Sequence, residues 1–191
     1  MADLSRCSRC GQTTKRTIKQ GHGKGKGAEF EGWCCKLFEK WWSVSKFVRT
    51  KNMQVVGTSY RLAHGDIVSV VGTSPLVLDP YFPFSIECKK DETWTFLDFF
   101  KADGRANAIE VWWKQCREDA IRWNKHPLLV FSKNYFPIMT ATLADVPIPY
   151  GVQGTGVKTR RTYVDLLGDS LCIMPLEDFF ASLKRREDVI L

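Results

Sequence analysis

Two apolar segments separated by one amphipathic helix constrain the fold of this 191-residue chain more than any other feature. Residues 84–89 and 127–132 are rich in large apolar side chains and predict buried strands. Between them, residues 107–124 carry apolar side chains at helical spacing. A strand, a helix and a second strand in this order predict a parallel pair joined by a right-handed crossover. We therefore expect an α/β fold in which a mixed sheet has helices on both faces.

The clearest helix is predicted over residues 28–42. Its apolar stripe consists of Phe30, Trp33, Cys34, Leu37, Phe38 and Trp41. Glu31 lies at the border of this stripe. Further strands are expected over residues 46–50, 66–71, 138–143 and 171–174, with a short extended piece at 76–78 and a terminal helix over 175–186. The tryptophans follow helical stripes and are expected in the core, with Trp42 and Trp94 as candidates for base stacking.

Composition divides the chain into an arm and one domain. Residues 1–27 are polar, basic and glycine-rich, so we expect a flexible basic arm followed by a single domain over 28–191 with a C-terminal strand and helix added. No apolar run could span a bilayer or form a signal-peptide core, which predicts a soluble cytoplasmic protein. The seven cysteines are an odd number and favour reduced thiols. Cys7 and Cys10 are half of a zinc site, but an arm without metal is the simpler interpretation.

The formal net charge of +7 favours a polyanionic partner over a neutral one. The excess is clustered, and the candidate phosphate contacts are Lys24, Lys26, Lys158, Arg160 and Arg161. The alternative is a solvated basic surface without a specific partner. If the partner is nucleic acid, affinity should fall as salt concentration rises.

One apolar strand carries a charged pair that needs an explanation. Glu87 and Lys89 are two residues apart, so they share a face of the predicted strand at about 6–7 Å. Asp66 begins the preceding strand, and the two acids converge if these strands pair. With the Cys88 main-chain carbonyl they could hold Mg²⁺ or Mn²⁺ for phosphodiester hydrolysis, with Lys89 orienting the attacking water. Glu31 could complete the metal shell directly or through water.

Two alternatives to this metal site remain open. Glu87 and Lys89 could be a structural ion pair on an edge strand. Asp79, which is nearer to Glu87 in sequence, is the rival of Asp66 as metal ligand. We prefer Asp66 because it leads directly into an Ile/Val-rich strand.

Four sequence elements in order resemble the PD-(D/E)XK nuclease superfamily, and within it the archaeal-type Holliday junction resolvases and related phage nucleases. They are Lys26-Gly27-Ala28-Glu29-Phe30-Glu31, Phe47-Val48-Arg49, Asp66-Ile67-Val68 and Ile86-Glu87-Cys88-Lys89. One departure is Gly65, where the family pattern has proline.

This resemblance implies a restriction-endonuclease-like fold and an active site formed by Glu31, Asp66, Glu87 and Lys89. It also implies a homodimer that cuts branched DNA such as four-way junctions, acting in the host cytoplasm if the gene belongs to a phage. Arg49 joins the candidate DNA-binding residues. A nuclease acting on linear or nicked duplex, and a DNA-binding module without catalysis, are the alternatives.

Overall fold

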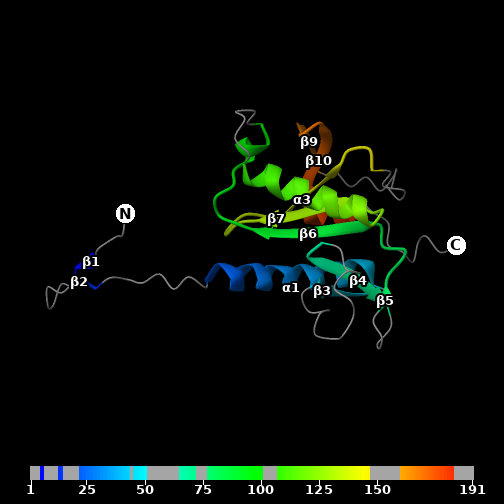
Figure 1. The fold of residues 1–191 in the computed structure, drawn as a ribbon, viewed down its shortest axis with the longest axis horizontal. Coiled ribbons are helices and arrows are strands. Elements are labelled where there is room, and N and C mark those ends of the chain that lie inside the picture. The colour runs from blue at the N-terminus through cyan, green and yellow to red at the C-terminus, as the bar shows by residue number, and fades with distance from the viewer. Residues whose placement is uncertain are drawn as a thin grey trace.

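An eight-stranded mixed β-sheet forms the centre of the molecule, with helices on both faces (Figure 1). The computed structural model describes residues 5–6, 13–14, 22–43, 45–50, 65–71, 77–100, 107–146 and 160–182. The sheet strands are β3 (Lys46–Arg49), β4 (Ile67–Val71), β5 (Val77–Leu78), β6 (Phe84–Lys90), β7 (His126–Ser132), β8 (Met139–Leu143), β9 (Thr162–Leu166) and β10 (Asp169–Pro175). A separate pair, β1 (Ser5–Arg6) and β2 (Thr13–Thr14), lies in the segment expected to be an arm.

The strand order is β3-β4-β6-β7-β8-β10-β9, with β5 beside β4. Strands β6 and β7 are parallel, and each of the other registered pairs is antiparallel. Helix α3 (Ala108–Arg122) connects the parallel strands. The structure therefore confirms the predicted α/β class and the strand–helix–strand unit, and it agrees with a restriction-endonuclease-like fold.

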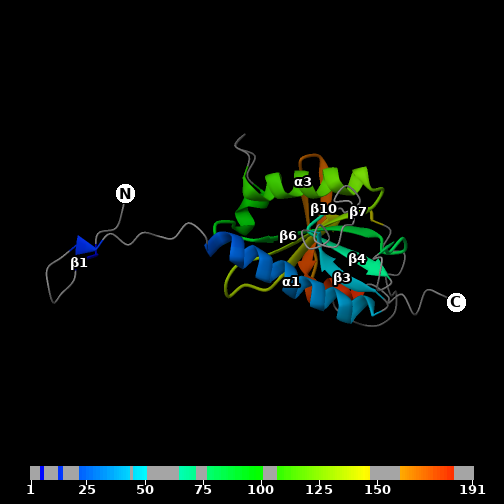
Figure 2. The same ribbon diagram turned by 60° about the horizontal axis from the view of Figure 1, so that its bottom comes forward.

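Each face of the sheet has its own apolar core. Helix α1 (His22–Trp42) and the short α4 (Leu176–Ser182) cover one face, where Phe38 and Trp41 of α1 meet Phe180 at ring-centroid distances of 5.1 and 5.0 Å. Helix α3 and the 3₁₀ turn η3 (Phe96–Phe99) cover the other face. Figure 2 shows α1 and α3 on opposite sides of β6 and β7. Side chains that alternate along β6 therefore point toward two different helical layers.

Helix α1 differs from the prediction in its start and in one buried position. It begins at His22 and not at residue 28, so part of the glycine–lysine segment expected to be flexible is helical. Glycine costs about 1 kcal/mol in a helix interior, but extending an existing helix is far easier than nucleating one. Trp33, which was predicted to lie in the core, is 48% exposed.

The C-terminal part of the fold was predicted less completely. Strand β9 and η3 were not expected, and Pro175 ends β10, so α4 begins one residue later than predicted; residues 183–186 of the predicted terminal helix lie outside the described residues. Strand β9 was missed because it is short and follows a Pro/Gly-rich segment, although its side chains alternate between buried and exposed as in a half-buried strand. Within the described ranges, none of the helices has the length and apolar character needed to cross a membrane.

Candidate active site

The candidate site lies where β4 and β6 separate. The two strands pair in register only at Ile67 and Ile86, and the main-chain N–H of Asp66 donates to the Ile86 carbonyl at 2.8 Å. Beyond this pair, β6 continues through Glu87, Cys88 and Lys89 beside β7. Because the two strands diverge here, no strand covers the β4 side of β6 at Glu87, Cys88 and Lys89, and polar groups at the centre of the sheet are left without a neighbouring strand.

Three predicted site residues come together at this separation. The Cys88 main-chain N–H donates to Asp66 Oδ2 at 2.9 Å, which fixes the carboxylate against β6. Lys89 Nζ lies 3.8 Å from Asp66 Oδ2 and donates a hydrogen bond to Glu87 Oε1. The Glu87 side chain is 1% exposed, whereas those of Asp66 and Lys89 are 17% and 23% exposed. One ammonium group is thus shared by two carboxylates at a site open on one side.

The main-chain carbonyl of Cys88 faces the same gap. In an extended strand the N–H and C=O of one residue point to the same side. Because the Cys88 N–H bonds Asp66, its carbonyl oxygen is directed to the Asp66 side of β6. The Cys88 side chain points away from the cluster and packs in the apolar core between the sheet and α1.

Burial and charge shift two pKa values in this cluster. Burial, together with the negative charge of Asp66, raises the pKa of Glu87 from 4.5 to about 7, although Lys89 acts in the opposite direction. Burial disfavours the charged form of Lys89, but the carboxylates of Glu87 and Asp66 outweigh it and raise the Lys89 pKa. The cluster therefore contains more negative charge than its one lysine can neutralise.

The main-chain conformation at residue 65 explains why this chain has glycine where the family pattern has proline. Gly65 has a φ of +65°, and a Cβ placed on it would lie 2.2 Å from the Ile86 carbonyl oxygen. Only glycine allows this conformation and this approach together. Thr50 supports the turn from the other side, since its Oγ1 donates to the Gly65 carbonyl at 2.7 Å and its N–H to the Asp66 carbonyl at 2.9 Å. The sequence signal was a glycine directly before an acid that opens an apolar strand.

Glu31 is held by Arg49 of β3, which belongs to the Phe47-Val48-Arg49 element of the family resemblance. Its side chain is buried, and Arg49 Nε donates to Glu31 Oε2 at 2.5 Å. Arg49 precedes Thr50, which binds the main chain of Asp66. Glu31 and Arg49 therefore form an ion pair that the end of β3 connects to the cluster. The guanidinium of Arg49 is engaged by Glu31, so its first role is to hold this carboxylate and not to bind DNA.

Asp79, the rival metal ligand, is engaged by structural hydrogen bonds. Its Oδ2 accepts from Trp42 Nε1 at 3.0 Å, from Ser45 Oγ at 2.7 Å and from Ser69 Oγ at 3.3 Å. Its Oδ1 accepts from the Tyr81 N–H at 3.0 Å. An oxygen surrounded by donors has little capacity left for a cation, so the geometry favours Asp66 over Asp79.

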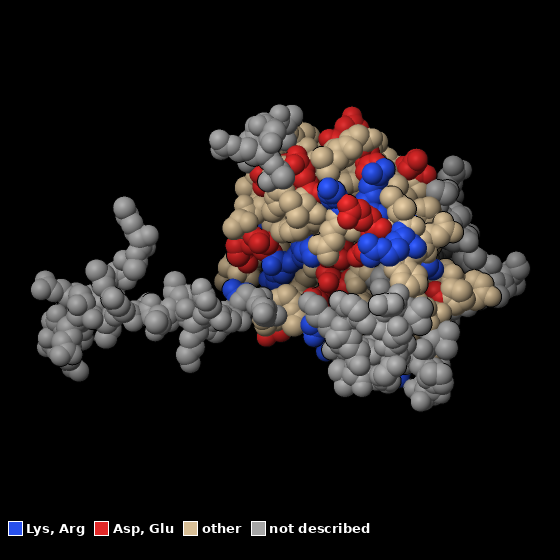
Figure 3. Space-filling view, in the orientation of Figure 1, with Lys and Arg blue, Asp and Glu red and all other residues tan. Residues whose placement is uncertain are grey.

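The predicted DNA-binding residues are dispersed. Lys26 is exposed on the first turns of α1, and the side chain of Lys24 lies outside the described residues, as do Lys158, Cys7 and Cys10. Arg160 donates to Glu177 and Asp178 of α4, with its Nε 2.9 Å from Asp178 Oδ2, while Arg161 is exposed. On the face shown in Figure 3, Lys and Arg side chains alternate with Asp and Glu and do not form one positive surface.

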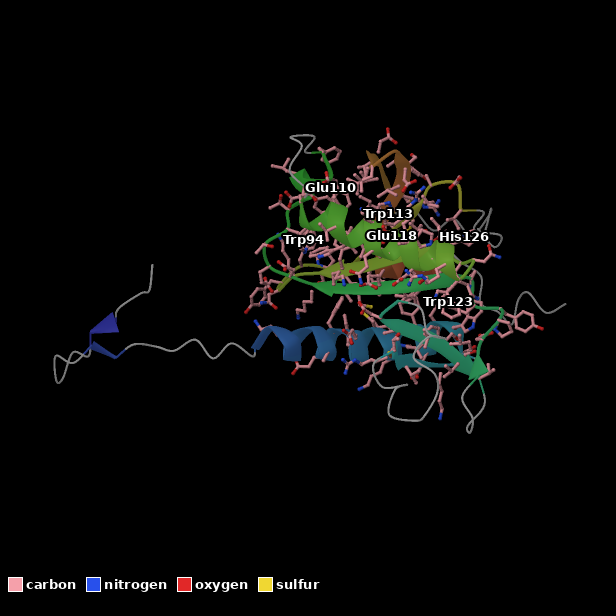
Figure 4. The ribbon with its side chains drawn as sticks, in the orientation of Figure 1. Trp94, Glu110, Trp113, Glu118, Trp123 and His126 are labelled. Atoms are coloured by element: carbon pink, nitrogen blue, oxygen red, sulfur yellow. The ribbon has the colours of Figure 1, made fainter. Side chains whose placement is uncertain are left out.

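The two tryptophans considered for base stacking are both buried. Trp94 is 1% exposed and Trp42 is 5% exposed, so neither offers a ring face to a ligand; both lie in the core, as expected for the tryptophans in general, and the base-stacking alternative was wrong for both. Figure 4 shows Trp94 and Trp113 on the α3 side of the sheet. His126 is at the start of β7, paired with Phe84, at the end of the strand pair remote from Lys89.

The donor set fits a hard divalent cation. Asp66 and Glu87 supply carboxylate oxygens, and the Cys88 carbonyl supplies a neutral one, which are the ligand types Mg²⁺ and Mn²⁺ prefer. Burial and the nearby Asp66 carboxylate raise the Glu87 pKa, and a bound divalent ion would favour the ionised form of both acids. In the described part of the chain, no group of three or more His, Cys, Asp or Glu side chains could hold a metal ion. Further ligands would therefore be main-chain oxygens and waters.

This combination of a divided mixed sheet, two acids and a lysine defines a class of metal-dependent nucleases. A family model described as "Phage putative PDDEXK endonuclease" matches residues 22–187, from the first residue of α1 to beyond α4. The chain belongs to this family of phage endonucleases. Comparisons with curated proteins and with solved structures gave no match.

The raised Glu87 pKa predicts that the site destabilises the metal-free fold. Because the folded state holds this proton more tightly than the unfolded state, stability should fall as pH rises from about 4.5 to about 7. Glu87→Gln should remove this loss, so at pH 8 it should raise the free energy of unfolding by about 3 kcal/mol, at about 1.4 kcal/mol per pKa unit, and should raise Tm accordingly.

Thermal unfolding in EDTA at pH 5 and pH 8 would measure this effect. The gain in Tm from Glu87→Gln should be larger at pH 8 than at pH 5. Glu118→Gln removes an exposed carboxylate of α3 and is the matched control, for which we expect the same small change at both pH values. Equal gains from Glu87→Gln at both pH values would contradict the assignment.

Proposed function

We propose that this protein is a Mg²⁺- or Mn²⁺-dependent DNA endonuclease that hydrolyses phosphodiester bonds in branched DNA, in the manner of a Holliday junction resolvase. The observation that carries the proposal is the convergence of Asp66, Glu87 and Lys89 where β4 and β6 separate. Family membership supports DNA cleavage. Branched DNA as substrate rests on the resemblance of the Lys26–Glu31 and Phe47–Arg49 elements to those of resolvases.

Each residue of the cluster has a distinct part in this reaction. Asp66, Glu87 and the Cys88 carbonyl would hold the metal, and Glu31 would complete the shell through a bridging water. When bound, the metal supplies a polarised phosphate and a more acidic water. Lys89, with a raised pKa, stays protonated at neutral pH and can orient that water or stabilise charge that develops on the phosphate oxygens.

Arg49 and Gly65 act on this site through position. Arg49 holds Glu31 by an ion pair, so its guanidinium fixes the direction of a carboxylate and also compensates its burial. Gly65 allows Asp66 to approach β6 closely enough for both of its hydrogen bonds. A site on the central strands of a sheet is held more rigidly than one built on loops.

Cleavage of a labelled four-way junction under single-turnover conditions tests the proposal. We expect paired cuts near the branch with Mg²⁺ or Mn²⁺ and no cuts in EDTA. An unlabelled junction should compete better than a linear or nicked duplex of the same sequence. Preferred cutting of linear duplex would replace the substrate and keep the chemistry, whereas salt-sensitive binding without metal-dependent cutting would leave a DNA-binding module.

The proposed homodimer has its own readout. A dimer places two active sites on one junction, so both strands should be cut within the lifetime of one complex. The doubly cut product should therefore accumulate without a singly cut intermediate. Sedimentation with and without junction DNA would show whether two copies are present. Cytoplasmic action in the host is part of the same proposal and follows from a DNA substrate inside an infected cell.

A further inference from the structure

A groove beside the N-terminal half of α1 combines lysines with exposed aromatic rings. It has a volume of about 370 Å³, at the lower end for ligand pockets, and lies between α1 and the loop that joins β7 to β8. Lys26, Lys90 and Lys133 contribute basic groups to its lining, and Glu29 contributes the acidic one. Figure 2 shows this loop, in yellow-green, against the N-terminal part of α1.

Two aromatic residues of this groove are exposed in a way that packing does not explain. Trp33 of α1 is 48% exposed, and Tyr135 in the loop is fully exposed. Tyr135 also has a φ of +58°, a left-handed conformation that is unfavourable for an aromatic residue. The Tyr135 side chain buries no surface that could offset this unfavourable conformation, and its exposed ring is available for a ligand.

The groove is close to the candidate site along β6. Lys89 and Lys90 are consecutive, so their side chains point to opposite faces, one into the acidic cluster and the other into the groove. Because β6 and β7 are parallel, Lys90 is paired with Ser132 and both strands end at this edge of the sheet. A chain passing around this edge could reach the cluster and the groove together.

We propose that this groove binds an unpaired single strand of the DNA substrate. Trp33 and Tyr135 stack on bases, and the three lysines bind phosphates. In a duplex the base faces are already stacked, so only an unpaired strand offers them to these rings. The proposal rests on the proposed function in taking branched DNA as the substrate, and it adds that bases at the branch, next to the cleaved bond, are unpaired in the bound state.

The charge on the groove supports this ligand over an apolar one. Lys133 Nζ donates to the Trp94 carbonyl at 3.3 Å and lies 5.0 Å from the Trp94 ring and 5.3 Å from the Phe136 ring, and none of these contacts neutralises its charge. A larger hollow of about 700 Å³ between η3 and β9 has exposed Tyr163, and the described residues that line it include Glu110 and Asp165 but no lysine or arginine. That second hollow does not suit a polyanion, and Tyr163 therefore serves as a matched control.

Fluorescence anisotropy with the full-length chain in EDTA tests the groove without cleavage. The probes are a labelled 12-nucleotide oligothymidine, an abasic oligomer of equal charge, and a blunt duplex. Trp33→Ala and Tyr135→Ala should each weaken oligothymidine binding about 10-fold, as expected for loss of one stacked base. Tyr135→Phe, which keeps the ring, and Tyr163→Ala should change it less than about two-fold. The unsubstituted protein should bind the abasic oligomer about 100-fold more weakly than oligothymidine, because both stacked bases are lost.

The lysines are tested through the salt dependence of the same binding. Lys90→Gln should lower the slope of log affinity against log salt by about 0.7, the value for one phosphate contact on a single strand. Lys114→Gln, on the exposed surface of α3, should leave the slope unchanged. Thermal unfolding of Tyr135→Asn separates binding from folding, because asparagine tolerates the left-handed conformation and stability should stay equal or rise while binding falls.

Three results would overturn the proposal. They are oligothymidine binding that survives both ring removals, equal loss of duplex binding in the same variants, and equal affinity for the abasic oligomer. Because none of these measurements needs cleavage, failure of the groove leaves the metal site untouched. Conversely, absence of cleavage would refute the proposed function without altering single-strand binding.

Discussion

Glutamine in place of Glu87 should lower the rate of metal-dependent DNA cleavage on the order of 10³-fold or more. The carboxylate is the most buried group of the cluster, and an amide offers the metal a weaker oxygen ligand and no negative charge. The fold should survive, because the amide matches the protonated acid that burial already favours. DNA binding in EDTA should change little, since Glu87 is 1% exposed and carries no positive charge.

Single-turnover cleavage with Mg²⁺ would measure this loss, with Asp66→Asn expected to behave in the same way. Two control variants separate the site from general effects. Glu118→Gln removes an exposed acid of α3, which is labelled in Figure 4, and this variant should cut normally. Asp79→Asn should lower Tm by disturbing four hydrogen bonds while the folded protein keeps its activity. Normal cleavage by Glu87→Gln would refute the metal site.

The same substitution is expected to stabilise the metal-free protein and to abolish its activity. Opposite signs are the usual consequence of gathering like charges at a buried site for function. They also make the two measurements mutually informative, because a residue with only a structural part would lose stability when replaced. Glu87 therefore separates the metal-site interpretation from the structural ion pair that its pairing with Lys89 alone allowed.

The sequence predicted the central unit of this fold because its periodicity is strong. The apolar runs around Ile86 and Leu128, with the helix between them, leave one arrangement that obeys the crossover rule. Asp66 could be placed near Glu87 because it leads directly into β4, the apolar strand expected to pair with β6. The alternation along β6 also placed Glu87 and Lys89 on one face.

Other features depended on tertiary context that no local pattern contains. Trp33 fits the helical stripe of α1, but it lies on the flank beside the groove, outside the layer that α4 completes. Trp94 comes from a polar stretch after β6 and is buried only because η3 and the β7–β8 loop enclose it with Phe131 and Phe136. The pairing of Arg49 with Glu31 required the position of β3 under α1, which the spacing of the residues does not specify.

Alanine in place of Gly65 should be the most damaging small substitution in the described site. A Cβ there would lie 2.2 Å from the oxygen and 2.8 Å from the carbon of the Ile86 carbonyl, both of which are main-chain atoms at the centre of the sheet. The left-handed conformation alone costs about 1–2 kcal/mol for a residue with a Cβ. Displacing the turn would also break the buried hydrogen bond from Asp66 to Ile86, at about 1–3 kcal/mol.

We therefore expect Gly65→Ala to lower the free energy of unfolding by about 3 kcal/mol or more, measured by urea denaturation. Cleavage by the folded fraction should fall at least about 100-fold, because Asp66 would move away from Glu87 and misplacement by about 1 Å is enough for such a loss. Gly168→Ala is the matched control: its φ is +82°, but a Cβ there would meet no atom within 4 Å. Gly168→Ala should lose only the free energy that the left-handed conformation costs and should retain full activity. If the two variants had equal stability and equal activity, the close approach of Gly65 to β6 would not be what positions Asp66.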